Sequence, residues 1–401
     1  MIREILRLVL IGGAAAAALV RAIRHPAPPL AATRESSRSR AIKRRLFEYA
    51  LLFAALGVVG LLGAASGIIP IRASSGHWPV TRWFLEFSKT RSVSTHTIGM
   101  KVPPLRDNAL VMKGAGAYDL SCRPCHGSPD LHHPRVARAM LPQPPYLPER
   151  IQKRSAAELF YIVKHGIKFT GMPAWPAQGR DDEVWSVVAF LLELPELDAE
   201  AYRRLVRGEQ PVTALQSLAG IPGSVIETCA RCHGLDGGGR GSSAYPRLAG
   251  QRRTYLFNAM QAFAEERRHS GLMEPVAVAL SVRQMRNIAA YFSTISPRPS
   301  PSRGTSPDAI MRGRAIASRG IAARKVPACA DCHGPSPSRK NDAYPILAGQ
   351  FADYLVLQLE LFKSGRRGGS RYAHLMRPVA AGLTPEQIRD VALYYESLGA
   401  P

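Results

Sequence analysis

Three copies of one short pattern carry the residues best suited to chemistry in this 401-residue chain. In each copy, two cysteines three positions apart are followed directly by a histidine and then by a glycine. The copies are Cys122-Arg-Pro-Cys125-His126, Cys229-Ala-Arg-Cys232-His233 and Cys329-Ala-Asp-Cys332-His333. Such a segment attaches haem covalently, because each thiol forms a thioether with a haem vinyl group and the adjacent imidazole reaches the iron. The sequence therefore predicts three covalently bound haem c groups, with the three histidines as proximal iron ligands.

Zinc binding and dithiol redox chemistry are the alternatives for a CxxC pair. The three motifs use all six cysteines of the chain, so none is left for a disulfide. A structural zinc ion needs four ligands, usually from a second CxxC or from two histidines separated by three to five residues. The motifs lie about a hundred residues apart and no such histidine pair follows them. A redox dithiol would need alternating strands and helices, which the pattern does not show.

Length and composition favour several small helical modules. A chain of 401 residues suggests two to three domains, and three haem motifs suggest three modules. A module of about 80 residues has little core of its own, so a covalently held apolar macrocycle would supply much of it. The 34 glycines and 32 prolines suit short helices joined by long irregular loops.

The formal net charge of +23 bears on partners. Nucleic acid explains it poorly, because no recognition motif or interleaving of basic and aromatic residues accompanies the charge. A basic surface instead favours rapid docking on acidic proteins or attraction to anionic lipid. We therefore expect redox partner proteins and a membrane, and no nucleic acid.

An apolar stretch near the N-terminus predicts a membrane anchor. Residues 46–69 read LFEYALLFAALGVVGLLGAASGII, with Glu48 as the one charged residue. This length matches a bilayer-spanning helix. Lys43, Arg44 and Arg45 precede it and place that end in the cytoplasm by the positive-inside rule. We predict a basic N-terminal segment (1–45), a transmembrane helix (46–71) and a juxtamembrane spacer (72–107). The haem-bearing part then lies on the periplasmic side of a bacterial inner membrane.

Two N-terminal features keep alternative interpretations. Residues 5–20, ILRLVLIGGAAAAALV, are compatible with a weak first span, a segment lying on the membrane surface or the apolar part of a signal peptide. After the anchor, Trp78, Trp83, Phe84 and Phe87 are compatible with an interfacial aromatic belt or with packing on the first haem domain.

Module 1 (residues 108–198) contains a candidate for the sixth iron ligand. Ser155 and Glu158 form a capping-box pattern that opens a helix, and another helix is expected from about 181 to 194. Met172 lies between these helices in the loop Thr-Gly-Met-Pro-Ala-Trp. The rival ligands are three histidines: His132, His133 and His165. The succession of leading helix, CxxCH, KHGIKFTGMPAW and C-terminal helix resembles a class I cytochrome c domain of cbb-type oxidase subunits. That resemblance implies Met172 as the distal ligand.

A charged connector (199–219) leads into a tandem repeat. Module 2 (220–295) contains AYPRLAGQ at 244–251, and module 3 (309–399) repeats it as AYPILAGQ, 99 residues later. In each module, a helix and a basic loop then precede a methionine that stands two positions before a proline: Met273 and Met376. The Pro/Ser-rich segment 296–308 reads as the linker between the two modules.

The spacing from histidine to methionine is similar in all three modules. Met172, Met273 and Met376 follow the motif histidines by 46, 40 and 43 residues, which favours His/Met ligation throughout. Modules 2 and 3 together resemble the diheme cytochrome c-four family, in which YPxLAGQ and a loop methionine before proline recur in both halves. Module 2 departs from that pattern, because only six residues, 223–228, lead into its motif. His269 and His374 are rival ligands, whereas Met260 and Met285 are expected in the core.

These observations predict an all-α protein with three tandem class I cytochrome c domains behind an N-terminal transmembrane anchor. His/Met ligation raises the potential of a haem and leaves no open position on the iron, so we expect an electron carrier without catalytic residues. The expected role is a relay between a quinol-oxidising complex or periplasmic dehydrogenase and a terminal oxidase. One alternative is the cytochrome subunit of a membrane alcohol or sugar-acid dehydrogenase complex. Less favoured alternatives are a haem peroxidase and a haem-based sensor.

Overall fold

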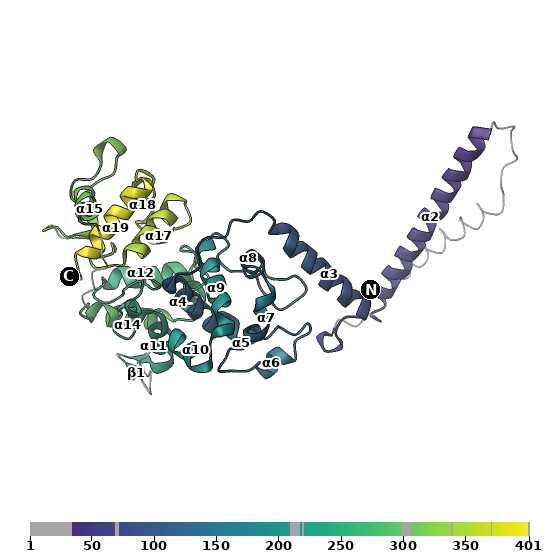
Figure 1. The fold of residues 1–401 in the computed structure, drawn as a ribbon, viewed down its shortest axis with the longest axis horizontal. Helices are drawn as coiled ribbons and strands as arrows, with labels where there is room; N and C mark the ends of the chain where they lie inside the picture. Colours follow the sequence, from purple (N-terminus) through teal and green to yellow (C-terminus); the bar gives the residue numbers. More distant parts are fainter. Residues whose placement is uncertain are drawn as a thin grey trace. The chain divides into compact units, whose positions relative to one another are not determined.

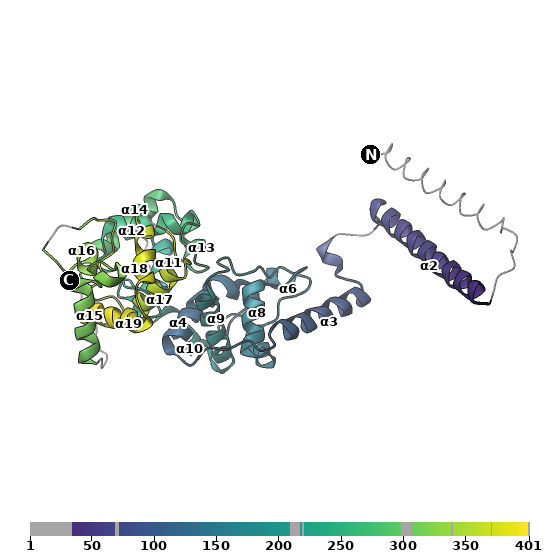
Figure 2. The ribbon, with the colours of Figure 1, turned by 90° about the horizontal axis from the view of Figure 1, so that it is seen from above.

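The computed structural model describes residues 34–68, 72–208, 217–218, 220–297, 306–337, 340–369 and 371–399 (Figures 1 and 2). The apolar stretch 5–20 and most of the linker 296–308 lie outside these residues. The chain divides into two units, Met1–Gly76 and His77–Pro401. Helices dominate both, and the one sheet in the described part is the two-residue pair β1 (Ser217–Leu218) and β2 (Ile221–Pro222). The all-α prediction is confirmed.

The first unit contains the candidate membrane anchor, α2 (Arg34–Ala65). Within it, Ser39–Ala65 is long and apolar enough to cross a membrane, with a mean hydropathy of 2.0. Arg44 forms an ion pair of 2.9 Å with Glu48, the one acid of the apolar stretch. The predicted C-terminal end of the transmembrane helix 46–71 is too late, because α2 ends at Ala65. Gly67 adopts a positive φ of 71° there, which stops the helix.

Helix α3 (Pro79–His96) opens the second unit after a short turn, η1 (Ala73–Ser75). The C-terminal end of α3 packs on module 1, where Val93 is buried and the His96 ring stacks on Tyr161 at 5.2 Å. The aromatic residues at its start do not pack there, since Trp83 is 65% exposed and Phe84 is 57% exposed. The structure therefore contradicts the alternative in which this aromatic segment packs on the first haem domain.

Module 1 is built from short helices around one apolar core. They are α4 (Asn108–Ala117), η2 (Tyr118–Cys122), α5 (Arg123–His126), α6 (Arg135–Arg138), α7 (Leu147–Arg150), η3 (Ile151–Lys153), α8 (Ala156–His165), α9 (Asp181–Glu193) and η4 (Leu194–Glu196). The predicted capping box is present at α8, where Ser155 accepts from the Glu158 backbone. Helix α9 begins and ends within one residue of the expected limits.

The connector contains a helix that the sequence did not predict. Helix α10 (Ala199–Arg207) starts at Asp198, whose side chain accepts a hydrogen bond from Ala201 N at 2.7 Å. Tyr202 and Val206, one turn apart, are buried in the module 1 core. The charges around them hid this narrow apolar face. The first half of the connector is thus part of the module 1 core.

Modules 2 and 3 have separate cores and similar helices. Module 2 has α11 (Gly223–His233), η5 (Gly239–Gly241), α12 (Arg253–Ala264), α13 (Met273–Val278) and α14 (Val282–Thr294). Module 3 has α15 (Pro307–Arg319), η6 (Ala322–Arg324), α16 (Cys329–His333), α17 (Ala352–Lys363), α18 (Ala373–Ala381) and α19 (Pro385–Ser397). Module 3 has a long leading helix, whereas module 2 carries its motif on the single short helix α11. The departure noted from the sequence is thus present in the fold.

A glycine lets the leading helix cross the C-terminal helix in modules 1 and 3. Gly114 of α4 lies against the backbone carbonyl of Ser186 in α9, and Gly313 of α15 lies likewise against Asp390 in α19. Helices α15 and α19 lie side by side in both views (Figures 1 and 2). A Cβ at either glycine would collide with that carbonyl oxygen, so any larger residue must push the helices apart.

We expect Gly114→Ala to lower the free energy of unfolding by about 1–3 kcal/mol, the usual cost of overpacking a core. Guanidinium denaturation of the holoprotein measures the change. Gly179→Ala is the matched control in the same module, because its Cβ would meet only Arg366 at an ordinary 3.9 Å. Equal stability of the two variants would contradict the role given to the glycine at this crossing.

Candidate haem-binding sites

The motif histidine is held in the same way in all three modules. The Nδ1 atoms of His126, His233 and His333 lie 2.9, 3.0 and 2.9 Å from the carbonyl oxygens of Pro145, Pro246 and Pro345. A carbonyl can only accept, so Nδ1 carries the hydrogen and the neutral ring leaves its lone pair on Nε2. Burial lowers the pKa of all three imidazoles, although the proline bond opposes this. Each ring is thus oriented, in the neutral form that a metal ligand requires.

The chain just after each histidine is also fixed in one way. The glycines after the motifs, Gly127, Gly234 and Gly334, have positive φ values of 70°, 76° and 74° and end their helices. A tyrosine then donates to a carbonyl oxygen in each module: Tyr118 to Gly127 at 2.7 Å, Tyr291 to Leu235 at 2.8 Å and Tyr395 to Gly334 at 3.0 Å. The repeated geometry indicates one kind of site built three times.

The surroundings of the first cysteine in each motif favour the neutral thiol. No disulfide joins any two of the six cysteines. Burial raises the pKa of the first cysteine in each motif, to about 12 for Cys122 and Cys229 and to about 11 for Cys329. In the described ranges, moreover, no three His, Cys, Asp or Glu side chains gather to form a metal site.

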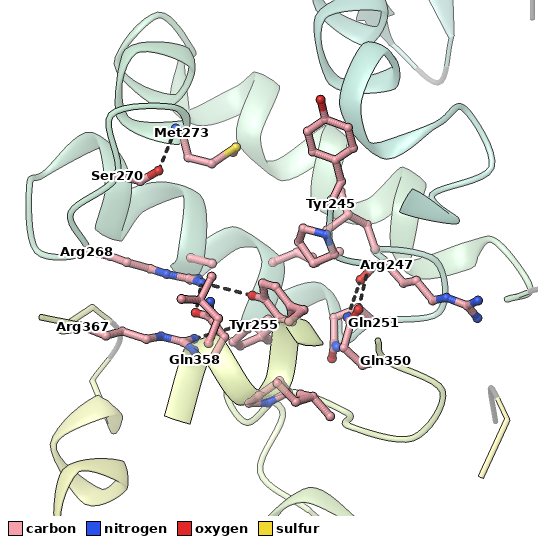
Figure 3. A pocket seen from close by; sticks show the side chains of 18 of the residues that line it. Tyr245, Arg247, Gln251, Tyr255, Arg268, Ser270, Met273, Gln350, Gln358 and Arg367 are labelled. Atoms are coloured by element: carbon pink, nitrogen blue, oxygen red, sulfur yellow. Dashed lines mark hydrogen bonds between the residues drawn. The ribbon is translucent and has the colours of Figure 1, made fainter. Parts of the chain in front are cut away.

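The predicted sites of modules 2 and 3 open into one apolar cavity of about 680 Å³. Its lining includes every predicted site residue of these two modules: Cys229, Cys232, His233, Met273, Cys329, Cys332, His333 and Met376. Figure 3 shows Met273 and Tyr245 on the walls of this cavity. Module 1 reaches it as well, because Tyr245 donates to the carbonyl of Met112 in α4 at 2.7 Å.

Two guanidinium groups on the cavity wall test whether a haem fits there (Figure 3). Arg268 lies over the Phe263 ring at 4.5 Å, and Arg367, 99 residues later, lies over Phe362 at 4.4 Å. Neither has a carboxylate partner among the described residues, although Arg268 donates to Tyr354 and Gln358, at 3.2 Å each. The buried Nε of Arg367 has no partner in that same part of the chain.

The pKa shifts around Arg268 and Arg367 favour a bound anion beside these two guanidinium groups. Burial, together with the neighbouring Arg268, lowers the pKa of Arg367 to about 10. Burial alone would raise the pKa of Tyr255, yet the two guanidiniums lower it below its usual value. An apolar cavity with paired cations at its edge fits a macrocycle that carries propionate groups. The residues present therefore fit haem, and Arg268 and Arg367 would hold its carboxylates.

The repeated glutamine of YPxLAGQ joins the two modules. Gln251 bonds both backbone groups of Ile346, accepting from N at 2.8 Å and donating to O at 3.0 Å. Gln350 does the same to Arg247, at 3.0 and 3.1 Å (Figure 3). The glutamine of each copy thus forms hydrogen bonds to the backbone of the other copy across the interface.

The three candidate methionines lie in different local structures. Met172 is half-buried in the expected loop, where its N–H donates to Thr170 Oγ1 at 3.1 Å. Met273 is the first residue of α13. Met376, expected in a loop, lies instead within α18. Pro378 does not prevent this, because it removes one N–H donor without ending the helix.

The rival histidines lie outside the cavity lining. The carbonyl of His269 accepts from Arg180 at 2.9 Å, and the exposed His374 bonds the Arg371 carbonyl at 3.1 Å. In module 1, the rings of His132 and His133 lie against Tyr146, and the ring of His165 lies against Tyr161. Met285 is buried in the module 2 core, as expected, whereas Met260 also lines the cavity.

A buried carboxylate that the sequence did not single out joins two haem motifs. Asp119 of η2 is 5% exposed and accepts from Tyr202 Oη at 2.9 Å and from Arg123 at 3.0 Å. It also binds Arg231 in an ion pair. Arg123 stands between the cysteines of the first motif and Arg231 between those of the second. Asp119 therefore holds these two attachment segments side by side.

Comparisons with known proteins find similar families for modules 1 and 2 and similar proteins among the cytochromes. A family model described as cytochrome c oxidase, cbb3-type, subunit III matches residues 109–191, and one described as cytochrome c matches 224–296. An electron acceptor of thiosulfate dehydrogenase from Thiomonas intermedia is 35% identical over 41% of this chain and 76% of its own length. Cytochrome c-552 of Acidithiobacillus ferridurans is 34% identical over 48% and 84%. Cytochrome c4 of Pseudomonas aeruginosa is 33% identical over 42% and 83%.

Proposed function

Because the chain belongs to the c-type cytochromes, which bind haem c covalently and transfer electrons, we propose that it carries three haems and relays single electrons along them. The observation that carries the proposal is the threefold recurrence of one site. Each CxxCH ends in a histidine whose Nδ1 donates to a proline carbonyl. A haem held by histidine and methionine exchanges one electron at a raised potential and has no free position for a substrate.

The proposed ligand sets follow the three modules. The thioether cysteines are Cys122 and Cys125, Cys229 and Cys232, and Cys329 and Cys332. The axial pairs are His126 with Met172, His233 with Met273 and His333 with Met376. For modules 2 and 3, the shared cavity lined by all eight residues supports this assignment. For module 1, the matched cbb3-type family model and the similar spacing support it.

Two contacts support an order of transfer in which module 2 lies between modules 1 and 3. Asp119 binds Arg123 and Arg231, so the attachment segments of modules 1 and 2 are neighbours. The sites of modules 2 and 3 line one cavity. We infer that electrons pass between modules 1 and 3 by way of module 2.

The spin state and ligand binding of the resting holoprotein test the relay against an enzyme. A peroxidase needs an iron with an open or displaceable distal position, whereas three His/Met sites have none. We expect low-spin iron in all three sites and no rapid binding of cyanide. A high-spin haem that takes up cyanide quickly would favour the peroxidase and overturn the relay.

The electron donor is proposed to be a periplasmic dehydrogenase. Two relatives that bear the name thiosulfate dehydrogenase electron acceptor support a donor of that class. The acceptor is proposed to be a terminal oxidase. Of the net charge of +23, +15 lies beyond residue 45, and this positive charge would speed docking on an acidic donor at low salt. We expect thiosulfate dehydrogenase and thiosulfate to reduce the holoprotein, at a rate that falls as ionic strength rises. Failure of this reduction, with reduction by a quinol-oxidising complex instead, would reassign the donor.

The proposed location is a bacterial inner membrane, with the haem modules in the periplasm. Helix α2 and the basic residues Lys43 to Arg45 before its apolar stretch support this orientation. The exposed Trp83 and Phe84 of α3 suit a membrane interface. In intact spheroplasts, external protease should remove the haem modules and leave α2 in the membrane fraction. Full protection of the modules would reverse the orientation.

A further inference from the structure

A second buried carboxylate lies where module 1 meets module 2. Glu183 of α9 is only 1% exposed, although the charge of a glutamate strongly disfavours burial. Its Oε1 accepts from Ser270 Oγ at 2.6 Å and lies 3.0 Å from the Arg180 guanidinium. Its Oε2 accepts from Gly271 N at 2.7 Å and from Trp175 Nε1 at 3.2 Å. Four donors from two modules therefore converge on one carboxylate.

Three of these donors come from the segments that carry the candidate axial methionines. Ser270 and Gly271 precede Met273 by three and two residues, and Trp175 follows Met172 by three. Ser270 Oγ also accepts from the backbone N–H of Met273 at 3.1 Å (Figure 3). Glu183 thus reaches the backbone of Met273 through one hydroxyl group.

The segment before Met273 is also restrained from its other sides. A Cβ at Gly271 would collide with the indole of Trp175, so the backbone lies directly against that ring. Arg180 donates to the carbonyl of His269 at 2.9 Å. Residues 269, 270 and 271 are therefore all held by side chains of module 1.

The corresponding segment of module 3 has a different environment. Before Met376, the Tyr372 ring packs against Tyr344 of its own module, and exposed His374 bonds the nearby Arg371 carbonyl. No side chain of another module bonds residues 372–375 in the described part of the chain. Of these two methionine segments, only the one in module 2 is thus held by side chains of a neighbouring module.

We propose that Glu183 is a positioning residue for Met273, through which the docking of module 1 sets the redox potential of the module 2 haem. The potential of a haem depends on its axial methionine and on the hydrogen bonds around its ligands. Hydrogen bonds to three successive residues, 269, 270 and 271, would restrict how the Met273 side chain can move when haem is bound. The inference rests on the proposed ligation by Met273.

Glu183→Gln tests the proposal in the full-length holoprotein. The amide keeps the shape of the side chain but presents an NH₂ group where one of the converging donors needs an acceptor. We expect one of three redox waves to move to lower potential, and the far-red methionine-to-iron absorption to fall by up to one third. The wave that moves should be the one that Met273→Ala displaces, and the other two should stay in place.

Glu193→Gln is the matched control, because it removes the same charge from an exposed position on the same helix. Ser270→Ala is the second variant. It removes the hydroxyl between Glu183 and Met273 while leaving the charge, and should shift the same wave by a smaller amount. If Glu183→Gln does not accumulate, Ser270→Ala decides the question.

The outcomes separate this inference from the ligand assignment. If Met273→Ala displaces one wave but Glu183→Gln and Ser270→Ala match Glu193→Gln, the positioning role is wrong and the ligation stands. If Met273→Ala itself leaves all three waves and the far-red absorption unchanged, the ligation is wrong and the inference falls with it. A shift of all three waves in Glu183→Gln would indicate a general loss of structure and would also overturn the specific role.

Discussion

Replacing Met273 with alanine is expected to remove about one third of the far-red absorption that marks methionine bound to ferric haem. It should also lower one of three redox potentials substantially, because axial ligands set haem potentials over a range of about 0.8 V. Met273 is expected to have this effect because it lines the cavity together with Cys229, Cys232 and His233. Alanine removes the proposed sulfur ligand, and the iron would take up water or remain open.

The control for this prediction is a methionine of the same module that does not face the cavity. Met285 of α14 is 3% exposed and packs in the module 2 core. Met285→Leu conserves volume and should leave the absorption and all three potentials unchanged. If Met273→Ala kept the full absorption, Met260, which also lines the cavity, would be the next candidate.

Asp119→Asn is expected to destabilise the junction of modules 1 and 2. Asp119 binds Arg123, Arg231 and Tyr202, and its side chain is 1% exposed. Removing one partner of a buried ion pair costs about 3–5 kcal/mol, because the remaining charges stay buried without compensation. Asparagine keeps one acceptor, so we expect a loss of about 3 kcal/mol in guanidinium denaturation. Electron equilibration between modules 1 and 2 should slow as well.

Asp331→Asn provides the comparison. Asp331 occupies the position in the third motif that Arg231 occupies in the second, and it is exposed to solvent. Its neutralisation should change stability by less than about 0.5 kcal/mol, as surface substitutions usually do. If the two variants had the same stability and the same equilibration rate, the account of the junction would be wrong.

Local and repeated features of the fold could be predicted from the sequence. The capping box at Ser155, helix α9 and the tandem helices follow from short-range patterns, and the structure has them. The sequence predicts the end of the anchor helix several residues too late, because Ile68 and Ile69 extend the apolar composition beyond the turn at Gly67. Helix α10 was missed, because its face of Tyr202 and Val206 is narrow, although the Asp198 cap was a usable signal.

The contacts between modules could not be predicted from one sequence. The sequence shows that YPxLAGQ is repeated. The hydrogen bonds of Gln251 and Gln350 to the other copy, however, depend on how the two copies face each other. Asp119 and Glu183 look like ordinary helix residues, since their partners Arg231 and Ser270 lie 112 and 87 residues away. Only the folded chain brings these groups together, in contacts between modules 1 and 2 and between modules 2 and 3.

The number of covalently bound haems per chain tests the central claim most directly. Mass spectrometry of the acid-denatured holoprotein gives this number, because thioether-linked haem stays on the chain while other haem is lost. We expect a mass excess equal to three haems, falling to two in Cys329→Ser/Cys332→Ser. A mass excess of two or fewer in the unaltered protein, or haem that leaves on denaturation, would contradict a three-site relay.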